Sequence, residues 1–524
     1  MFDAGTRRPQ RTVLGVVHNV TSATRLLDVL PLVATDPRVE VAVTCTNSSP
    51  FTADVDPYLA AHGFRTVPWD EPGHADLAIA ASHGRLHELG TPLVVLPHGT
   101  GYNKFLNGSV FGMEPASLLH NGRVIASSLV FSHDEQLDRL RRSCPEALGA
   151  AVVAGDPCFD RMLASRPLRH TYRDAAGVRP DQKLVFVSST WGPSSLFDAT
   201  PDLVRTLRAE LPLDEYAIAI ALHPNVQALH SRWQVERWLD ACLRAGVALI
   251  PRAEGWRAGL VSADLVVGDH GSVTFYGAAL GTPTLLATWP HDRLDPGSPV
   301  GRFVAAADRL DRSTPLEPQV RAALHDQRTH DDITGLTTSV PGSSARLLRT
   351  ELYRLLDLPE PADAAPTHAV PLPQWRVRPP TVEAVRIEYT VSDNSLNGTV
   401  VRHATDPRPL PAHTYLVVST DEPTATALEL ADAVVHARPG DAHAWITGTL
   451  AALPGAMVAT APIDDTTWLV GTRTGCIAFT SPDGDGRVWA PLVLAWLERH
   501  PLEDFPHRVW LQSSRSWRAF AAQI

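Results

Sequence analysis

Lysine is almost absent from this chain of 524 residues, which contains only Lys104 and Lys183. Lysine and arginine together number 46 against 57 acidic residues, so the net charge is -11, and no dense basic block occurs. This charge argues against nucleic acid as the main partner and against strong attraction to anionic lipid. No run approaches about 20 apolar residues, so we expect no membrane span, while peripheral association stays open.

Cysteine is also scarce, with five scattered residues and no CxxC pair. The spacing argues against a disulfide framework and against a zinc knuckle. The apolar run at residues 13–17 is too short for the hydrophobic region of a signal peptide. His83 and His87 have the spacing of a metal pair, but Gly84 intervenes and no third ligand is near. We therefore expect a cytoplasmic protein without a metal or cofactor.

The chain is long enough for two or three domains. Short β-branched runs alternate with amphipathic stretches through residues 1–160, and the same alternation returns in residues 161–358. The expected strands are residues 12–17, 39–44, 77–80, 93–96, 129–132 and 152–153, then 184–188, 216–222, 247–250, 265–268 and 284–286. Strands separated by helices imply parallel sheets covered on both faces. The sequence thus predicts an α/β protein with two Rossmann-like, doubly wound domains.

Seven prolines lie within residues 359–380, a density that neither a helix nor a central strand tolerates. We interpret this segment as a linker. The strand-like runs beyond it, together with a helical pattern at residues 491–499, predict a smaller α+β domain over residues 381–524. No motif there indicates a role.

Four short segments that follow predicted strands are the candidates for chemistry. They are residues 96–104 (LPHGTGYNK), 154–160 (AGDPCFD), 222–225 (LHPN) and 268–273 (GDHGSV). In doubly wound sheets ligands bind beyond the carboxyl ends of the strands. Two such halves are expected to face each other across a cleft.

The first segment contains a candidate base and a candidate cation. The ordinary pKa of histidine suits His98 to removing a proton from an acceptor hydroxyl, although a histidine satisfied by loop carbonyls is the alternative interpretation. Lys104 stands in an arginine-biased chain, which favours a need for a compact ammonium, as in phosphate contact. Chance occurrence on a solvated loop is the alternative for Lys104.

The segments of the second half are suited to phosphate. Gly271 and Ser272 are expected at a helix N-terminus, where free amides and the helix dipole bind anions. Alternatively, Asp269 and Ser272 only cap that helix. Pro224 favours extended backbone at His223, which would project the imidazole from a strand end towards a donor phosphate, with a structural histidine as the alternative.

At these segments the chain resembles the CDP-glycerol glycerophosphotransferase family of GT-B enzymes over about residues 11–345. That family carries His-Gly-Thr ahead of a Lys, a Gly-x-Pro-x-x-Asp segment, a His in the second half, and an Asp-Tyr-Ser-Ser loop that opens a helix. The similar residues here are His98, Gly99, Thr100 and Lys104, then Gly155, Pro157 and Asp160, then His223, and finally Asp269, His270, Gly271 and Ser272.

The resemblance implies a GT-B fold in which His98 is the acceptor-activating base. It implies donor binding by a set of residues from both halves: Thr100, Lys104, His223, Asp269, His270, Gly271 and Ser272. The chain departs from the family in three ways. Lys104 lies one residue later, His270-Gly271 replaces Tyr-Ser, and Tyr276 stands where the family usually has an acidic residue for the nucleotide ribose.

The sequence therefore predicts a metal-independent transferase that moves a glycosyl or polyol-phosphate group from a CDP- or UDP-linked donor to a hydroxyl acceptor. A second hypothesis is an enzyme similar to the non-hydrolysing UDP-N-acetylglucosamine 2-epimerases, which also use a His-Pro-Asn segment but need several acidic groups in the cleft. A third is a catalytically silent GT-B module that binds a nucleotide or a protein.

Overall fold

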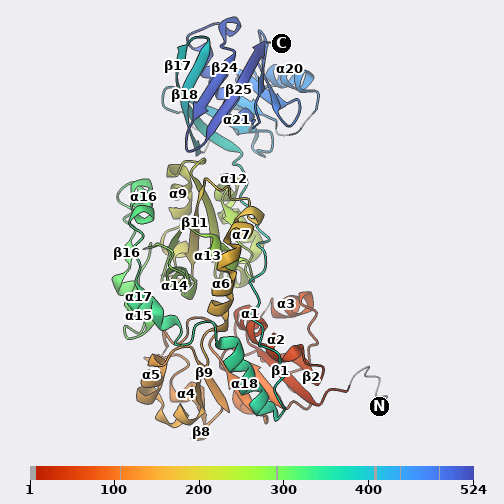
Figure 1. Ribbon diagram of the computed structural model, residues 1–524, viewed down its shortest axis with the longest axis vertical. Helices are drawn as coiled ribbons and strands as arrows, with labels where there is room; N and C mark the ends of the chain where they lie inside the picture. Colours follow the sequence, from red (N-terminus) through yellow and green to blue (C-terminus); the bar gives the residue numbers. More distant parts are fainter. Residues whose placement is uncertain are drawn as a thin grey trace.

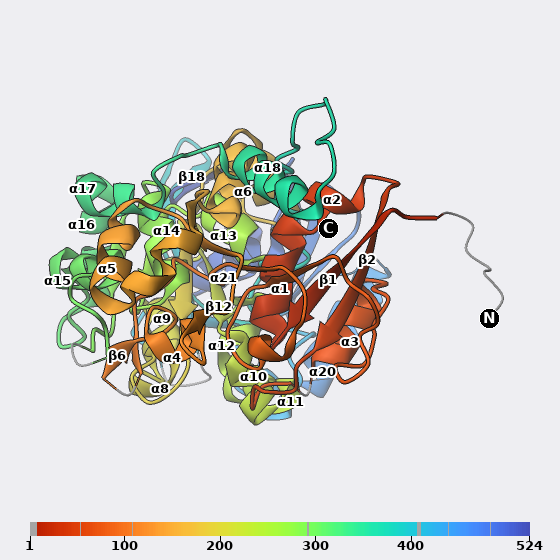
Figure 2. The same cartoon turned by 90° about the horizontal axis from the view of Figure 1, so that it is seen from below.

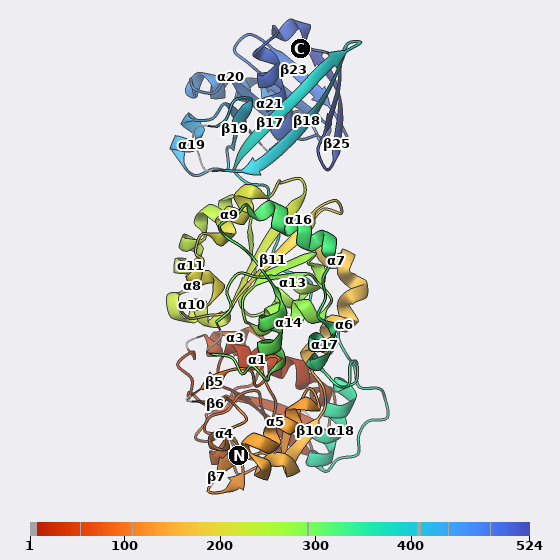
Figure 3. The same ribbon diagram turned by 90° about the vertical axis from the view of Figure 1, so that its left-hand side faces the viewer.

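Three bodies are stacked end to end along the longest axis of the molecule (Figure 1, Figure 3). The structure, a computed structural model, describes residues 8–52, 54–106, 108–290, 293–405, 410–436, 438, 440–482 and 484–523. The first two bodies each contain a six-stranded parallel sheet, and the third is a closed barrel. In the described ranges no helix combines the length and the apolar character needed to cross a membrane.

The first sheet is wholly parallel and has the strand order β10-β9-β4-β3-β1-β2. Its central strands are buried on both faces, as their unbroken apolar sequences require. The strands are β1 (Arg11–Val17), β2 (Val39–Cys45), β3 (Leu77–Ala80), β4 (Leu93–Val95), β9 (Ser128–Phe131) and β10 (Ala151–Val153). The helices are α1 (Val20–Val29), α2 (Pro31–Ala34), α3 (Val55–Ala61), α4 (Pro115–Leu118) and α5 (Glu135–Ser143), while α6 (Pro157–Ser165) contributes Cys158 and Met162 to the core of the second domain. Two short hairpins, β5–β6 (Phe105–Leu106, Ser109–Val110) and β7–β8 (Leu119–His120, Arg123–Val124), complete this domain.

The second sheet repeats this design with the order β13-β12-β11-β14-β15-β16, again wholly parallel. Its strands are β11 (Lys183–Ser189), β12 (Tyr216–Leu222), β13 (Ala248–Leu249), β14 (Leu265–Gly268), β15 (Thr284–Leu286) and β16 (Asp308–Arg309). Its helices are α7 (Arg169–Ala175), α8 (Leu196–Ala199), α9 (Leu203–Glu210), α10 (Pro224–His230), α11 (Arg232–Trp238), α12 (Asp240–Arg244), α13 (Trp256–Ser262), α14 (Ser272–Ala279), α15 (Pro299–Ala306), α16 (Leu316–Asp326) and α17 (Asp331–Thr334). The two parallel sheets expected from the sequence are thus present.

Helix α18 (Ser344–Leu356) returns from the second domain to the first (Figure 2). It buries Leu348 and Leu352 in the core of the first domain, and the hydroxyl of Tyr353 donates to Asp36 Oδ2 at 2.8 Å. The range 161–358, expected to form the second domain, therefore ends in a helix that packs on the first. The crossing ties the two sheets together.

All of residues 359–380 are described, and none lies in a helix or strand. The segment nevertheless packs tightly against the second domain, where Val370 and Trp375 are each 4% exposed. Trp375 Nε1 donates to the carbonyl of Gly255 at 3.2 Å, and the amide of Val377 donates to that of Ala176 at 2.9 Å. What was expected as a linker is an ordered strap.

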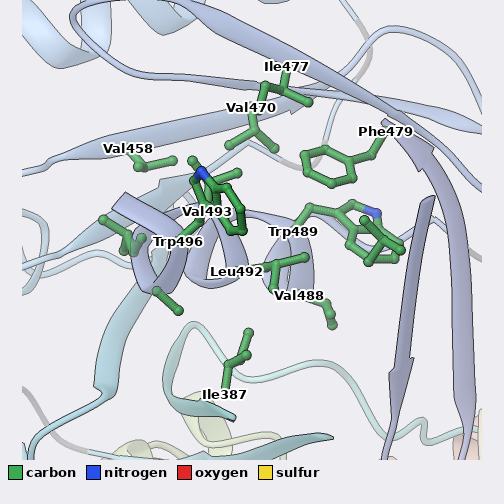
Figure 4. Packing of buried hydrophobic residues seen from close by; sticks show 14 of the residues in the cluster. Ile387, Val458, Val470, Ile477, Phe479, Val488, Trp489, Leu492, Val493 and Trp496 are labelled. Carbon is green, nitrogen blue, oxygen red and sulfur yellow. The ribbon is translucent and has the colours of Figure 1, made fainter. Parts of the chain in front are cut away.

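The third body is a closed barrel with the order β17-β18-β24-β25-β23-β22-β21-β20-β19, where the sequence predicted a smaller α+β domain. Residues 488–496 of α21 (Gly486–Leu497) are all buried, so the helix fills the barrel instead of lying on its surface, with Trp489 stacked on Phe479 (Figure 4). The strands are β17 (Val382–Ser392), β18 (Ser395–Ala404), β19 (Thr414–Ser419), β20 (Ala433–Val435), β21 (Val458–Pro462), β22 (Thr467–Gly471), β23 (Cys476–Thr480), β24 (Arg508–Gln512) and β25 (Ser516–Gln523). Helices α19 (Ala425–Glu429) and α20 (Ala442–Ala452) accompany them.

Buried ion pairs hold the barrel on the second domain. The guanidinium of Arg402, on β18, contacts both carboxylate oxygens of Asp214 at 2.6 and 3.1 Å. Arg244 Nη1 of α12 contacts Glu422 Oε1 at 2.8 Å. This contact lies at the end of the second domain that faces away from the first (Figure 1).

Candidate functional site

Loops from the two parallel sheets touch where the domains meet, and we call this region the interdomain junction. The loop after β4 carries His98, Gly99 and Thr100, and Ser272 begins α14 on the other side. The amide and the hydroxyl of Thr100 donate to Ser272 Oγ at 3.3 and 3.1 Å. A Cβ at Gly99 would lie 2.7 Å from the same oxygen, so the approach requires glycine. Two segments selected from the sequence are therefore in direct contact.

A second contact between the domains runs through the backbone beside Lys104. The amide of Phe105 donates to the carbonyl of Arg293 at 3.0 Å, and the amide of Asp295 donates to that of Asn103 at 2.8 Å. Lys104 itself forms a β-bridge with Leu294. This pairing fixes the loop that carries Lys104 against the second domain.

The first turn of α14 has no side-chain cap. Gly271 is the N-cap residue, so the amides there keep their donor capacity. Asp269 has another role than the expected donor contact, because its carboxylate is wholly buried. It accepts hydrogen bonds from the amides of Thr190, Leu196 and Gly271 at 2.7 to 3.1 Å. Asp269 thus positions the loop that a donor phosphate would meet.

His98 has its two ring nitrogens in different surroundings. Nδ1 lies 2.9 Å from the carbonyl oxygen of Ala81, which can only accept, so Nδ1 carries the proton. Nε2 is then left with a lone pair, and the residue keeps access to solvent although protein atoms crowd the imidazole. Desolvation by the surrounding protein lowers the pKa of His98 to about 4, and the charges of Arg25 and Lys104 act in the same direction. At neutral pH His98 is an uncharged imidazole with a free acceptor nitrogen.

His223 lies on the second domain, and its neutral ring carries the proton on the other nitrogen from that of His98. It is the N-cap residue of α10, and its Nδ1 accepts the amide hydrogen of Asn225 at 3.1 Å. The proton of the neutral ring is therefore on Nε2, which is a donor. Burial lowers the pKa of His223 to about 3, with Lys104 and His98 as further causes. A neutral N–H donor suits a phosphate oxygen.

Positively charged side chains lie close to His270 at the junction. Burial lowers the pKa of His270 to about 4, against the attraction of Asp269, and the charges of Lys104 and Arg293 lower it further. Nearby protein atoms likewise lower the pKa of the Lys104 ammonium by desolvation, although the residue as a whole is exposed. His270 Nδ1 is buried and has no hydrogen-bond partner among the described residues. A bound anion would relieve these repulsions, so the electrostatics favour a negatively charged ligand.

Sequence reasoning missed several residues of this region. His18 follows β1 directly, and its Nε2 lies 3.0 Å from the carbonyl oxygen of Gly84. Burial lowers the pKa of His83 to about 4, and His18 and His98 contribute to that shift. The ring of Trp191, after β11, lies 6.3 Å from that of His223. The signal that could have found them is their place at strand ends, which they share with His98.

Tyr276 does not offer a carboxylate where the family resemblance implies one for the ribose. Its side chain is buried, its hydroxyl donates to Asp156 Oδ2, and Arg25 Nη2 donates to that hydroxyl at 3.1 Å. Arg25 also contacts Asp156 at 2.8 Å. Arg25 of α1, Asp156 before α6 and Tyr276 of α14 thus form a buried polar network, which lies one helical turn after Ser272.

The described part of the chain contains no group of three or more His, Cys, Asp or Glu side chains that could hold a metal ion. Among the described residues, Lys104 and Arg293 supply positive charge beside His270, and the neutral imidazoles and the amides at the start of α14 supply hydrogen-bonding groups. The chemistry open to these groups is proton transfer and the binding of anions.

No protein-family model and no curated protein matches this sequence. One similar solved structure is a variant of the wall teichoic acid polymerase TagF soaked with CDPG, with a TM-score of 0.47, 12% identity, and coverage of 67% of this chain and 90% of that chain. Another is the co-structure of S. aureus MnaA with UDP, with a TM-score of 0.41, 13% identity, and coverage of 68% and 100%. A putative UDP-N-acetylglucosamine 2-epimerase from Listeria monocytogenes has a TM-score of 0.42, 14% identity and the same coverage.

Proposed function

We propose that the interdomain junction is the active site of a metal-independent transferase, which moves a glycosyl or polyol-phosphate group from a nucleotide-diphosphate donor to a hydroxyl acceptor. The observation that carries the proposal is the pair of opposite tautomers, a proton acceptor at His98 Nε2 and a proton donor at His223 Nε2. A transfer between two bound substrates needs both kinds of group.

In the proposed reaction the acceptor hydroxyl gives its proton to His98 Nε2 while its oxygen attacks the donor. The bond between the transferred group and the donor phosphate breaks, and the nucleotide leaves with the electron pair. The negative charge on the leaving phosphate is met by His223 Nε2–H, by the amides at the start of α14, and by Lys104. The low pKa of His98 in the free protein rises when the anionic donor binds, which brings the base closer to its working range.

The junction favours a transferase over an epimerase. An epimerase of the kind considered above needs accessible acidic groups, whereas the carboxylates described near this junction, Asp156 among them, are already engaged. Asp269 is wholly buried among backbone amides, and Asp295 pairs with Arg139 at 3.0 Å. The CDP or UDP nature of the donor is part of the proposal and rests on the family resemblance.

The test compares His98→Asn with wild type in two assays. With CDP-glycerol and UDP-sugars as donors and a mixture of polyols and oligosaccharides as acceptors, the variant should release nucleotide about 10²–10⁴-fold more slowly. Its melting temperature and its thermal shift with CDP and UDP should stay close to wild type.

His87→Asn is the matched control, because His87 is exposed and stacks on His120, away from the junction. Near wild-type release by the His98 variant would contradict the assignment of the base. Nucleotide binding by the wild type without release from any donor would favour the non-catalytic module instead.

A further inference from the structure

Two adjacent strands of the barrel carry exposed aromatic and arginine side chains on their outer face. Trp510 of β24 is 45% exposed and Phe520 of β25 is 69% exposed. In the antiparallel register Arg508 lies opposite Phe520, and Trp510 lies opposite Arg518. We call these four residues the β24–β25 face. Exposed aromatic groups of this size, side by side on a rigid sheet, usually belong to a binding surface.

The charge of this region differs from that of the whole chain. None of the strands β18, β23, β24 and β25 contains an aspartate or a glutamate, in a protein of net charge -11. Among the described residues the side chains of Arg508 and Arg518 form no ion pair and no hydrogen bond. The Arg518 guanidinium is instead stacked over the Trp510 ring, 4.2 Å from its centroid. Within the described part of the chain, no acidic side chain pairs with the two arginines of this face.

Neutral polar groups extend the face on both sides of Trp510. Asn397 of β18 lies opposite Trp510, and Thr399 lies opposite Gln512. All three polar residues are exposed, so their amides and hydroxyl are free to meet a partner in solution. An aromatic ring presents an apolar platform, amides and hydroxyls pair with hydroxyl groups, and arginine binds carboxylate or phosphate through two parallel hydrogen bonds.

We propose that the β24–β25 face binds a negatively charged carbohydrate chain. The sugar rings lie on Trp510 and Phe520, the ring hydroxyls meet Asn397 and Gln512, and the acidic groups of the chain meet Arg508 and Arg518. A single-stranded nucleic acid fits less well. Its binding uses a row of cationic side chains along the phosphate backbone, and this face supplies only the two arginines. The inference is independent of the chemistry proposed for the junction, since the barrel lies at the other end of the second domain (Figure 3).

The experiment measures binding by the full chain in native affinity gels that contain alginate, dextran sulfate or phosphomannan, with neutral dextran as the reference. We expect at least one of the three anionic polysaccharides to retard the wild type more than dextran does. The variants Trp510→Ala/Phe520→Ala and Arg508→Gln/Arg518→Gln should each bind at least about tenfold more weakly, since contacts to charged groups and to aromatic platforms are lost.

The control variant Arg232→Gln/Trp233→Ala removes the same residue types from α11, where Trp233 is 68% exposed. It should bind like wild type. The proposal is overturned if none of the three polysaccharides retards the wild type, or if the α11 variant loses binding equally. It is also overturned if the face variants lose binding to a dT20 oligonucleotide or lose a dimer seen by size-exclusion chromatography, because the partner is then a nucleic acid or a second copy of the chain.

Discussion

Histidines at the junction make the stability of the protein depend on pH. Burial lowers the pKa of His18, and it lowers the pKa values of His83, His98 and His270 to about 4 and of His223 to about 3. The ordinary pKa of histidine in an unfolded chain is about 6.5. Between these values the unfolded state binds more protons, so stability rises with pH and is complete above about pH 6.5. We predict that the free energy of unfolding in urea falls as the pH is lowered from 7.5 to 5.

Substitution separates these histidines from the other titrating groups. His223→Asn should make the loss of stability between pH 7.5 and pH 5 smaller than in wild type, because one group with a lowered pKa has been removed. His87→Asn, at an exposed position, should leave the pH dependence unchanged. Identical pH dependence in wild type and in the His223 variant would show that this imidazole is not desolvated in the folded protein.

Ser272 and His223 are expected to contribute unequally to donor binding. A ligand that binds only the folded state stabilises it by about 2.7 kcal/mol at a hundredfold excess over its Kd, so CDP or UDP should raise the melting temperature. Ser272→Glu sets a carboxylate at the start of α14 and should abolish the shift by like-charge repulsion. His223→Ala removes one donor among several and should reduce the shift less. Equal shifts in all three proteins would mean that the diphosphate binds elsewhere.

At the scale of elements, the loop after β4 contacts the start of α14 closely because Gly99 has no side chain. Gly99→Ala would bring a Cβ to 2.7 Å from Ser272 Oγ and 3.3 Å from Ser272 Cβ, so the Ser272 side chain has to turn away or the β4 loop has to shift from α14. We predict a lower melting temperature and weaker nucleotide binding, measured by thermal shift. Gly90→Ala is the matched control, since a Cβ there meets nothing within 4 Å. A Gly99 variant that behaves like the Gly90 variant would show that the two elements are not in tight contact.

The strands of the two parallel sheets could be predicted because each is a short apolar run with polar residues on either side. β16, Asp308–Arg309, was missed because two polar residues carry no such pattern. In the barrel β18, β20, β21, β24 and β25 were missed, although β24 and β25 alternate buried and exposed residues as a half-buried strand does. Burial of α21 on all sides depends on strands far away in sequence, which no local pattern reveals.

At the scale of the whole molecule, the residues that meet at the junction were predictable as strand ends, but their roles were not. His98, His223 and Ser272 each follow a strand, and the parallel sheets bring those ends together. The tautomers of the histidines depend on backbone groups of Ala81 and Asn225, and the burial of Asp269 depends on the loop after β11. Each of these contacts forms within a single domain, and each depends on a loop geometry that the short sequence motifs do not specify.

The strap of residues 359–380 determines where the chain can be shortened. A chain that ends at residue 358 loses Val370 and Trp375 from the core of the second domain, whereas a chain that ends at residue 380 keeps both. Loss of two buried side chains of this size costs several kcal/mol, of the order of 2–5 kcal/mol for each large residue. We predict that the shorter chain aggregates or melts well below the longer one.

The longer chain should remain folded and should keep the thermal shift with nucleotide, because the barrel lies away from the junction. Removing the barrel also removes Arg402 from Asp214, which keeps Arg179 as a partner within the second domain. Urea unfolding of the two shortened chains and the full chain, with and without CDP or UDP, measures both effects. Equal stability of the two shortened chains would show that the strap does not contribute to the core, and loss of the nucleotide shift in the longer one would show that the barrel takes part in donor binding.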